Sequence, residues 1–216
     1  MRKVSSTLGR MSIVLLLVTV AMASLLLVPQ VVRADQDAFL FVNHYYQKDL
    51  VEIVGALTYL GSLEMGAIWV AVLFLAKRGD LASYVVVAVT IELLYAMVTK
   101  TLVDRPRPYE VLSGVHYLDS QFGQSFPSAH AAGAFAISVV LGMKERRYLL
   151  PLVLMAAAVA FSRVYTGVHY PLDVIAGAAG GIIIGYYASK LNVGPMRTYF
   201  RGLRDRLLNE GRESQA

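Results

Sequence analysis

The feature that most limits the fold is a largely apolar run from Met11 to Val32, which begins after Arg10 and ends before Arg33. A helix needs about 20 such residues to cross the hydrocarbon core of a bilayer. A cleavable signal peptide is the alternative, because basic residues precede the run and Val32-Arg33-Ala34 resembles a cleavage site. The apolar part of a signal peptide has about 7–15 residues, so this longer run favours a retained membrane helix.

The composition also indicates a membrane protein. The 216 residues are 56% hydrophobic and 16% charged, with a mean hydropathy of +0.55, whereas soluble domains have about 45–50% apolar and ~25% charged residues. These values exclude a disordered chain, a collagen-like repeat and a disulfide scaffold. Because the chain has no cysteine, it forms no disulfide, no thiolate zinc site and no cysteine nucleophile.

Similar apolar stretches recur along the chain and predict an all-α fold, a polytopic bundle of six transmembrane helices in a single membrane domain, 1–216. The spans are expected at about 11–32, 51–76, 81–103, 128–143, 148–165 and 172–190. Residues 35–50 mix acidic and aromatic side chains, which is typical of the membrane interface. Residues 191–216 predict a basic amphipathic helix on the cytoplasmic membrane surface, with a disordered basic tail as the alternative.

Small residues indicate which helices pack most closely. Gly177, Gly181 and Gly185 form a stripe along the last predicted span, and such stripes let helix backbones approach each other in lipid. Alanines are frequent in the fourth and fifth spans. We therefore expect these three helices to form the tight core.

The basic residues predict the orientation of the bundle. With the N-terminus in the cytoplasm, most of the 20 Lys and Arg residues fall on the cytoplasmic side, as the positive-inside rule requires. They are Arg2, Lys3, Arg10, Lys77, Arg78, Lys144, Arg146, Arg147, Lys190, Arg197, Arg201, Arg204, Arg206 and Arg212. This arrangement explains the net charge of +5 and the pI of about 9.4 without nucleic acid. It predicts a multi-pass protein of the plasma or inner membrane, with both termini cytoplasmic.

The other six basic residues fall on the opposite side, and two of these are Arg33 and Lys48. The remaining four lie near two polar loops, and they are Lys100, Arg105, Arg107 and Arg163. Basic side chains near the membrane interior are costly and usually have a partner. The carboxylates of these loops are too few for simple pairing, so an anionic ligand, phosphate above all, is the better partner. Arginine offers phosphate a planar fork of donors, and lysine a point charge.

Three motifs surround these cations: KTLVDRPRP from Lys100, FPSAH ending at His130, and SRVYTGVHYPLD ending at Asp173. The second motif predicts a helix start at Pro127-Ser128, where free backbone N–H groups face an anion. In the third, His169 precedes Asp173 by four residues. That spacing lets the carboxylate accept a hydrogen bond from one imidazole nitrogen and leaves the other nitrogen free to attack.

These motifs, K-x6-RP, PSAH and SR-x5-H-x3-D, resemble the signature of the type 2 phosphatidic acid phosphatase superfamily. Alanine at position 129 replaces the glycine usual in that family's middle motif, but the backbone N–H group is kept. The resemblance implies a phosphoryl transfer without metal or cofactor, in which His169 attacks phosphorus, Asp173 orients His169, and His130 protonates the leaving oxygen. It implies that the phosphate is held by Lys100, Arg107, Ser128, Ala129 and Arg163.

Other polar residues are less specific. Asp104 and Arg105 are possible accessory residues, or they pair with each other at the loop edge. Glu110 and His116 suit a solvated position or the substrate entry, and His44 suits the interface. The intramembrane carboxylates are either functional or bonded to neighbouring helices; they are Glu64 and Glu92.

The expected function is that of a lipid phosphatase whose active site faces the periplasm or the exterior at the membrane surface. Its expected partners are the bilayer and a membrane lipid phosphate: phosphatidic acid, phosphatidylglycerol phosphate or undecaprenyl (polyprenyl) diphosphate. The alternatives are a phospholipid-binding transporter or scaffold without hydrolysis, and a lipid phosphotransferase. The sequence does not select among the lipids and does not determine the oligomeric state.

Overall fold

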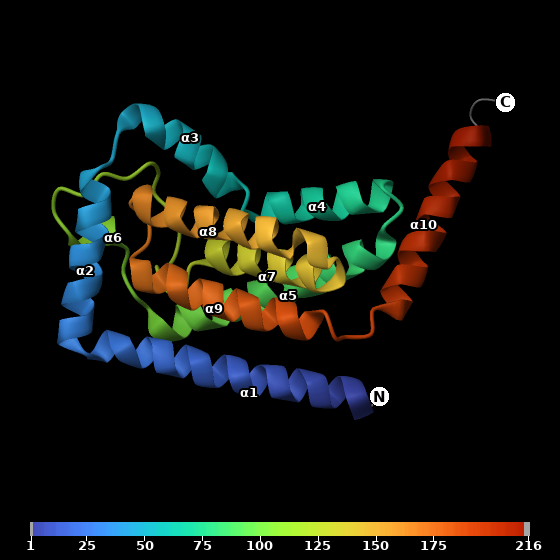
Figure 1. Ribbon diagram of the computed structural model, residues 1–216, viewed down its shortest axis with the longest axis horizontal. Helices are drawn as coiled ribbons and strands as arrows, with labels where there is room; N and C mark the ends of the chain where they lie inside the picture. The colour runs from blue at the N-terminus through green and yellow to red at the C-terminus, as the bar shows by residue number, and fades with distance from the viewer. Residues whose placement is uncertain (1, 214–216) are drawn as a thin grey trace.

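The computed structural model describes the backbone of residues 2–213 and the side chains of residues 6–207, and this part of the chain is all helical apart from its loops (Figure 1). The side chains of Arg2, Lys3 and Arg212 and the end of the predicted tail, 214–216, lie outside the described residues. The helices are α1 (Arg2–Ser24), η1 (Leu25–Leu27), α2 (Pro29–His44), α3 (Lys48–Tyr59), α4 (Leu63–Leu75), α5 (Gly79–Val103), α6 (Pro108–Val111), α7 (Ala129–Lys144), η2 (Arg146–Tyr148), α8 (Leu149–Tyr165), α9 (Pro171–Ala188) and α10 (Gly194–Glu213).

Helix α7 is the centre of the bundle. Every residue from Ala131 to Gly142 is buried, and α5, α8 and α9 all pack against this helix. Two apolar clusters meet along it, one joining α7 to α2, α8 and α9, and the other joining it to α5 and α9. The small side chains of α7 thus let three neighbours surround it closely.

The glycine stripe of α9 makes the closest of these contacts. A Cβ atom at Gly177 would lie 2.4 Å from the carbonyl oxygen of Ser128. One at Gly181 would lie 2.2 Å from that of Ala132, and one at Gly185 would lie 2.6 Å from the Ala136 carbonyl. Any side chain at these positions would force the two backbones apart, so the predicted close packing of these helices is present.

Four helical segments are long and apolar enough to cross a membrane: Ser6–Leu27, Gly79–Val111, Arg146–Tyr165 and Pro171–Ala188. Helices α3 and α4 together make a fifth candidate. Helix α7 is apolar but has only 16 residues, about 24 Å at 1.5 Å per residue, which is shorter than a typical hydrocarbon core of about 30 Å. The described residues therefore contain four to five candidate spans.

The predicted span 11–32 is wrong at its end. The apolar helix stops at Leu27, and Val28 is extended (φ −99°, ψ 106°) before α2 begins at Pro29. Proline restricts the preceding residue to extended conformations and lacks an N–H group, so it starts a new helix and cannot continue the old one. Helix α2 then turns away from α1 and passes across the end of the bundle (Figure 1).

The predicted span 51–76 is not one straight helix. It is divided into α3 and α4, which meet at an angle of 53°. Ser62 starts the second part, because its hydroxyl accepts a hydrogen bond from the Met65 N–H group at 3.2 Å. Gly61 lies at the bend, where a Cβ atom would be 2.8 Å from the His130 carbonyl oxygen. The bend thus brings this elbow against the start of α7.

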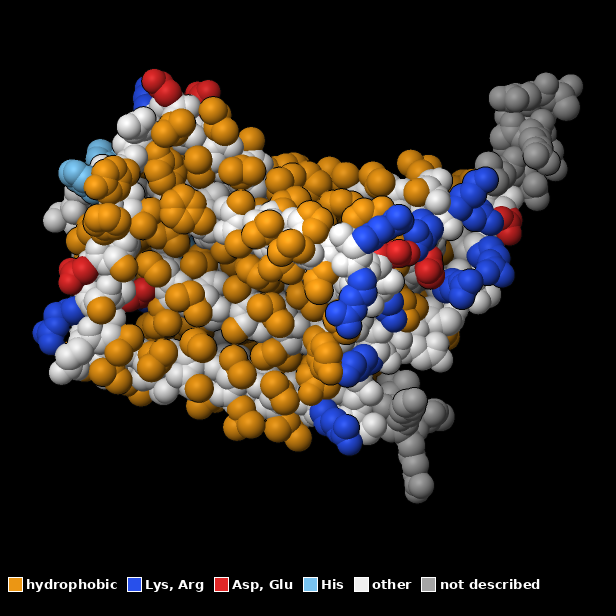
Figure 2. All heavy atoms as spheres, in the orientation of Figure 1, with side chains coloured by type: hydrophobic (Ala, Val, Ile, Leu, Met, Phe, Trp, Pro, Cys, Tyr) orange, Lys and Arg blue, Asp and Glu red, His pale blue; other side chains and the backbone are white. Residues whose placement is uncertain are grey.

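The two ends of the bundle differ in charge. Most visible Lys and Arg side chains gather at the end where α10 leaves the bundle, and apolar side chains cover the body (Figure 2). The two ends of the chain also lie toward this end (Figure 1). The three sequence motifs lie at the opposite end, which is spanned by α2 and α6.

Candidate active site

The three motifs meet because each one lies at a helix end. Lys100 is in the last turn of α5, and Arg163 is in the last turn of α8. His130 is in the first turn of α7, and Asp173 is in the first turn of α9. The loops are joined directly, since the Ser128 N–H group donates to the Asp173 carbonyl oxygen at 3.0 Å. The chain thus brings residues about 70 positions apart into one site.

His169 is held by its neighbours through its Nδ1 atom. Its Nδ1 atom lies 3.5 Å from Asp173 Oδ2 and 3.3 Å from Ser125 Oγ. The Ser125 hydroxyl donates its hydrogen to Asp173 Oδ2, so its oxygen accepts from His169 Nδ1–H. This network assigns the proton to Nδ1 and leaves Nε2 with a free electron pair. The predicted orientation by Asp173 therefore runs largely through Ser125, which the sequence reasoning missed.

The carboxylate of Asp173 is itself fixed by two further donors. Arg105 Nη1 donates to Oδ1 at 2.7 Å, and the Tyr170 N–H group donates to Oδ2 at 2.9 Å. The Arg105 guanidinium also lies 3.9 Å above the ring centre of Tyr170. With Ser125, these contacts satisfy a carboxylate that is fully buried. Asp173 is thereby held in one orientation.

The possible pairing of Arg105 with Asp104 is wrong. Arg105 Nη2 donates instead to Asp35 Oδ2 at 2.6 Å, and the other oxygen of Asp35 accepts from the Leu172 N–H group at 2.8 Å. Asp104 has a left-handed backbone (φ 49°) and accepts from the side chain of Gln124. The expectation failed because Asp35 lies on α2, far away in sequence. Burial raises the pKa of Asp35, and the hydrogen bond and positive charge of Arg105 oppose that rise.

Arg107 lies beside Nε2 of His169. Its guanidinium is 3.4 Å from His169 Nε2 and donates to the carbonyl oxygens of Gly123 at 2.8 Å and Val168 at 2.9 Å. Neutral carbonyl groups hold this cation in place without cancelling its charge. Lys100 Nζ likewise donates to a carbonyl oxygen, that of Gln124. Among the described residues, neither side chain forms an ion pair with a carboxylate.

Arg163 has no such support. It is only 4% exposed, and its Nε atom is buried without a hydrogen-bond partner among the described residues. No described carboxylate forms an ion pair with it. A buried guanidinium without a partner is costly, and phosphate oxygens match its donors. This orphaned donor is the strongest structural sign of an anion site.

The start of α7 faces the same place. Ser128 is the N-cap, and its hydroxyl accepts from the Ala131 N–H group at 3.4 Å. The backbone N–H group of Ala129 lies in the first turn of the helix, where no preceding carbonyl can bond it. Helix starts of this kind favour anions. His130 follows and lines a cavity of about 140 Å³ between α4, α5 and α7.

His169 is suited to act as a neutral nucleophile. Burial lowers its pKa, and the positive charges of Arg163, Arg107 and Lys100 lower this pKa further. The imidazole therefore stays unprotonated at neutral pH, with its electron pair on Nε2. Burial also raises the pKa of Tyr170 to about 12, so the phenol beneath Arg105 stays neutral.

A family model described as the PAP2 superfamily matches residues 80–195, more than half of the chain and all three motifs. The chain belongs to the PAP2 superfamily. Undecaprenyl-diphosphatase BcrC of Bacillus subtilis is 42% identical over 82 residues, which are 38% of this chain and 42% of BcrC. The matched part is thus less than half of either chain.

Two solved structures of membrane proteins resemble this one. Aquifex aeolicus LpxE is 32% identical with a TM-score of 0.67, over 72% of this chain and 94% of LpxE. The first transmembrane PAP2 type phosphatidylglycerolphosphate phosphatase of Bacillus subtilis is 21% identical with a TM-score of 0.71, over 82% of this chain and 94% of the other. The second likeness concerns the fold alone.

The other polar residues divide into structural and unexplained ones. Glu110 accepts a hydrogen bond from the Arg107 N–H group at 2.6 Å, and His116 is stacked on Tyr46 with ring centres 5.2 Å apart. Glu92 is 4% exposed, and its Oε1 atom has no partner among the described residues. It shares the cavity of His130. In the part of the chain that the structure describes, no group of three or more His, Asp or Glu side chains is placed to hold a metal ion.

Proposed function

We propose that this PAP2 superfamily member is an integral-membrane lipid phosphatase that works through a phosphohistidine on His169. The observation that carries the proposal is the buried Nε atom of Arg163, which has no partner among the described residues, in a residue whose carbonyl oxygen accepts from the N–H group of the oriented His169 at 3.3 Å. A site that only bound phospholipid would need the cations. It would not need a nucleophile whose proton is fixed on Nδ1 by Ser125 and Asp173.

In the first step, His169 Nε2 attacks phosphorus, and the bond from phosphorus to the lipid oxygen breaks. His130 gives its proton to the departing oxygen as general acid. The bound phosphate dianion favours the protonated form of His130, because an opposite charge nearby stabilises the imidazolium. As the attack proceeds, positive charge develops on the His169 imidazole and its Nδ1–H group becomes more acidic. The carboxylate of Asp173 stabilises this positive charge through Ser125.

In the second step, water attacks the phosphohistidine and the P–N bond breaks. His130, now neutral, accepts the proton of the water, and inorganic phosphate leaves. The equatorial oxygens lie against Lys100, Arg107, Arg163, the Ala129 N–H group and the start of α7 at Ser128. These fixed positive charges neutralise the transition state, so the proposed mechanism requires no metal or cofactor.

We further propose that the bundle crosses the membrane six times as one domain, with α3 and α4 as one bent span and α7 as a short one. The basic end of the molecule then faces the cytoplasm with both termini, and the site faces the periplasm or the exterior. The charge distribution in Figure 2 supports this orientation. A cysteine placed at Ser113 should then react with a membrane-impermeant reagent from outside only; reaction from the cytoplasm alone would contradict it.

The proposed substrates are lipid phosphates and diphosphates whose phosphate lies at the membrane surface. Undecaprenyl diphosphate is the first candidate, because BcrC carries that activity in its name. Phosphatidic acid and phosphatidylglycerol phosphate are the other two. The site is consistent with each of them, since its polar contacts are made to the phosphate.

The test is phosphate release by the purified chain in detergent with EDTA, for each of these three lipids. We expect release from at least one of them, and His169→Ala should abolish it. His44→Ala is the matched control, because His44 is exposed at the end of α2 and its loss should leave the rate unchanged. No release from any of the three lipids would favour a non-hydrolytic binder. Phosphate transfer to an added alcohol in place of release would favour a phosphotransferase.

A further inference from the structure

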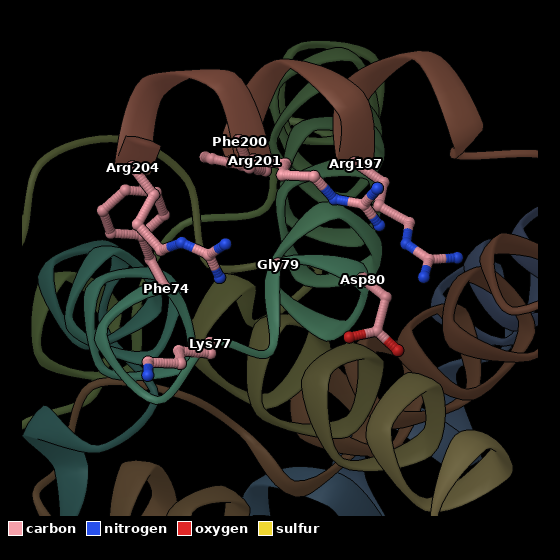
Figure 3. A pocket seen from close by; sticks show the side chains of 8 residues that line it. All are labelled: Phe74, Lys77, Gly79, Asp80, Arg197, Phe200, Arg201 and Arg204. Carbon is pink, nitrogen blue, oxygen red and sulfur yellow. The ribbon is translucent and has the colours of Figure 1, made fainter. Parts of the chain in front are cut away.

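A second cluster of cations lies at the end of the bundle opposite to the active site. Four basic residues line a pocket of about 220 Å³ between α10 and the turn from α4 to α5 (Figure 3). They are Lys77, Arg197, Arg201 and Arg204. Gly79 begins α5, and Lys100 follows it by 21 residues, about 30 Å along the helix. The pocket is therefore separate from the catalytic site by about the thickness of a bilayer.

The pocket has more positive charge than its own acids can neutralise. Lys77, Arg197 and Arg201 form no ion pair with any described side chain. Arg204 pairs with Asp205 at 3.0 Å. The one acid of the lining, Asp80, lies 3.8 Å from Arg78, which itself pairs with Glu145 at 2.5 Å.

The shape of the pocket is set by the packing of α10 against α4 and the start of α5. Phe200 of α10 lies against Phe74 of α4, with ring centres 5.8 Å apart. A Cβ atom at Gly79 would lie 3.3 Å from Phe200 Cβ, so α10 rests closely on the start of α5. In Figure 3, Arg197 and Arg201 extend from α10 toward this turn. The aromatic contact thus fixes the helix that carries the arginines.

The position of the pocket specifies the kind of anion. It lies where α4 ends and the membrane-crossing helix α5 begins, which is the depth of lipid headgroups. Apolar side chains around it are exposed, with Leu75 at 78% and Tyr199 at 60%, as is typical of a surface covered by lipid. We propose that this pocket binds the phosphate of an anionic phospholipid headgroup, with the acyl chains of that lipid along α4 and α5. Arginine donors match its phosphate oxygens.

The test counts lipid molecules bound to the full chain by native mass spectrometry in detergent, with phosphatidylglycerol against phosphatidylcholine. We expect phosphatidylglycerol adducts on the wild type, and a loss of about tenfold or more in affinity in Arg197→Gln/Arg201→Gln, since each basic residue near a membrane surface contributes about 1 kcal/mol. Both side chains are exposed, so this variant should keep the wild-type unfolding temperature.

Two controls separate the pocket from general charge and from the catalytic site. Lys190→Gln/Arg206→Gln removes the same charge from the same end of the molecule outside the pocket, and should keep the adducts. Arg163→Gln removes a cation from the catalytic site and should also keep them. An equal loss in the Lys190/Arg206 variant would overturn the proposal, because bulk charge would then explain binding. A loss in Arg163→Gln alone would overturn it as well, and would place the lipid in the catalytic site.

A competition experiment distinguishes binding of a lipid from binding of a soluble phosphate. Soluble glycerol 3-phosphate and inorganic phosphate are added to the phosphatidylglycerol complex. We expect neither to displace the lipid at millimolar concentration, because they lack the chains that lie against α4 and α5. Displacement by either one would show that the pocket takes a soluble anion, and would contradict the proposal. None of these measurements depends on phosphatase activity.

Discussion

Arg105 Nη1 lies 2.7 Å from Asp173 Oδ1, although 68 residues separate the two in the chain. This contact fixes the carboxylate that orients His169, and Arg105 is fixed in turn by Asp35 of α2 at 2.6 Å. The helix that crosses the end of the bundle is therefore connected to the nucleophile through two ion pairs. Because all three side chains are buried, removal of Arg105 would leave two buried carboxylates without the cation that pairs with both of them.

Ser125→Ala should lower kcat by about 10- to 100-fold and change KM by less than about twofold, because the lost hydroxyl orients His169 and does not bind substrate. The measurement is steady-state phosphate release. Ser189→Ala serves as the control, because it removes a hydroxyl that donates to the Tyr186 carbonyl oxygen in the last turn of α9, at the other end of this helix from Asp173. A change in KM with an unchanged kcat would show that Ser125 binds substrate instead.

Arg163→Gln should lower kcat/KM by about 100- to 1000-fold, since the guanidinium supplies charge that the transition state requires. It should also weaken product inhibition by inorganic phosphate. Arg163→Lys should recover part of the lost kcat/KM and part of the inhibition by phosphate, because lysine restores the positive charge without the planar set of donors of a guanidinium. If Arg163→Gln still bound phosphate like the wild type, the orphaned donor would not be part of the anion site.

The pKa of His169 makes a prediction about stability. Burial lowers this pKa in the folded protein, whereas the unfolded chain has an ordinary histidine near 6.5. Below about pH 6.5 the unfolded state therefore binds a proton that the folded state does not, so stability falls as the pH falls. His169→Gln should reduce this dependence between about pH 5 and 7, measured as unfolding temperature in detergent. An unchanged slope would contradict the lowered pKa.

Gly181→Ala should lower the free energy of unfolding by about 1–3 kcal/mol, the usual cost of overpacking a tight core, because the new methyl group would lie 2.2 Å from the Ala132 carbonyl oxygen. Gly202→Ala in α10 is the matched control, since nothing lies within 4 Å of its added Cβ atom. Chemical unfolding in detergent measures both. Equal effects would mean that the α7–α9 contact is looser than described.

Glu92→Gln should change the free energy of unfolding by less than about 1 kcal/mol, because a buried carboxyl without a partner is better accommodated in its neutral form, which Gln resembles in shape. Glu92→Lys should destabilise strongly, since it places a long cation in the same cavity. Thermal unfolding measures both variants. If Glu92→Gln cost as much as Glu92→Lys, Glu92 would be ionised and bound to a partner.

Much of the fold could be predicted from the sequence, because a helix that crosses the hydrocarbon core needs about 20 mostly apolar residues. Long apolar runs predicted helices, and the glycine stripe together with the alanines predicted which three helices pack closely. The break at Val28 depended on Pro29, whose local restriction is visible in the sequence although the run of apolar residues hid it. The elbow between α3 and α4 was less visible, because it depends on Gly61 lying against α7, a contact between distant segments.

The sequence by itself determined which residues the proposed chemistry uses: three motifs contain the proposed nucleophile, acid and cations, and local spacing placed each at a helix end. Only the tertiary structure decided which groups control them. Ser125 lies between His169 and Asp173, and Arg105 pairs with Asp35 and not with Asp104. The buried Nε atom of Arg163 has no hydrogen-bond partner in the part of the chain that the structure describes. The physical reason is that ion pairs and hydrogen bonds depend on distance in space. Helices that cross a membrane bring together residues that the sequence keeps far apart.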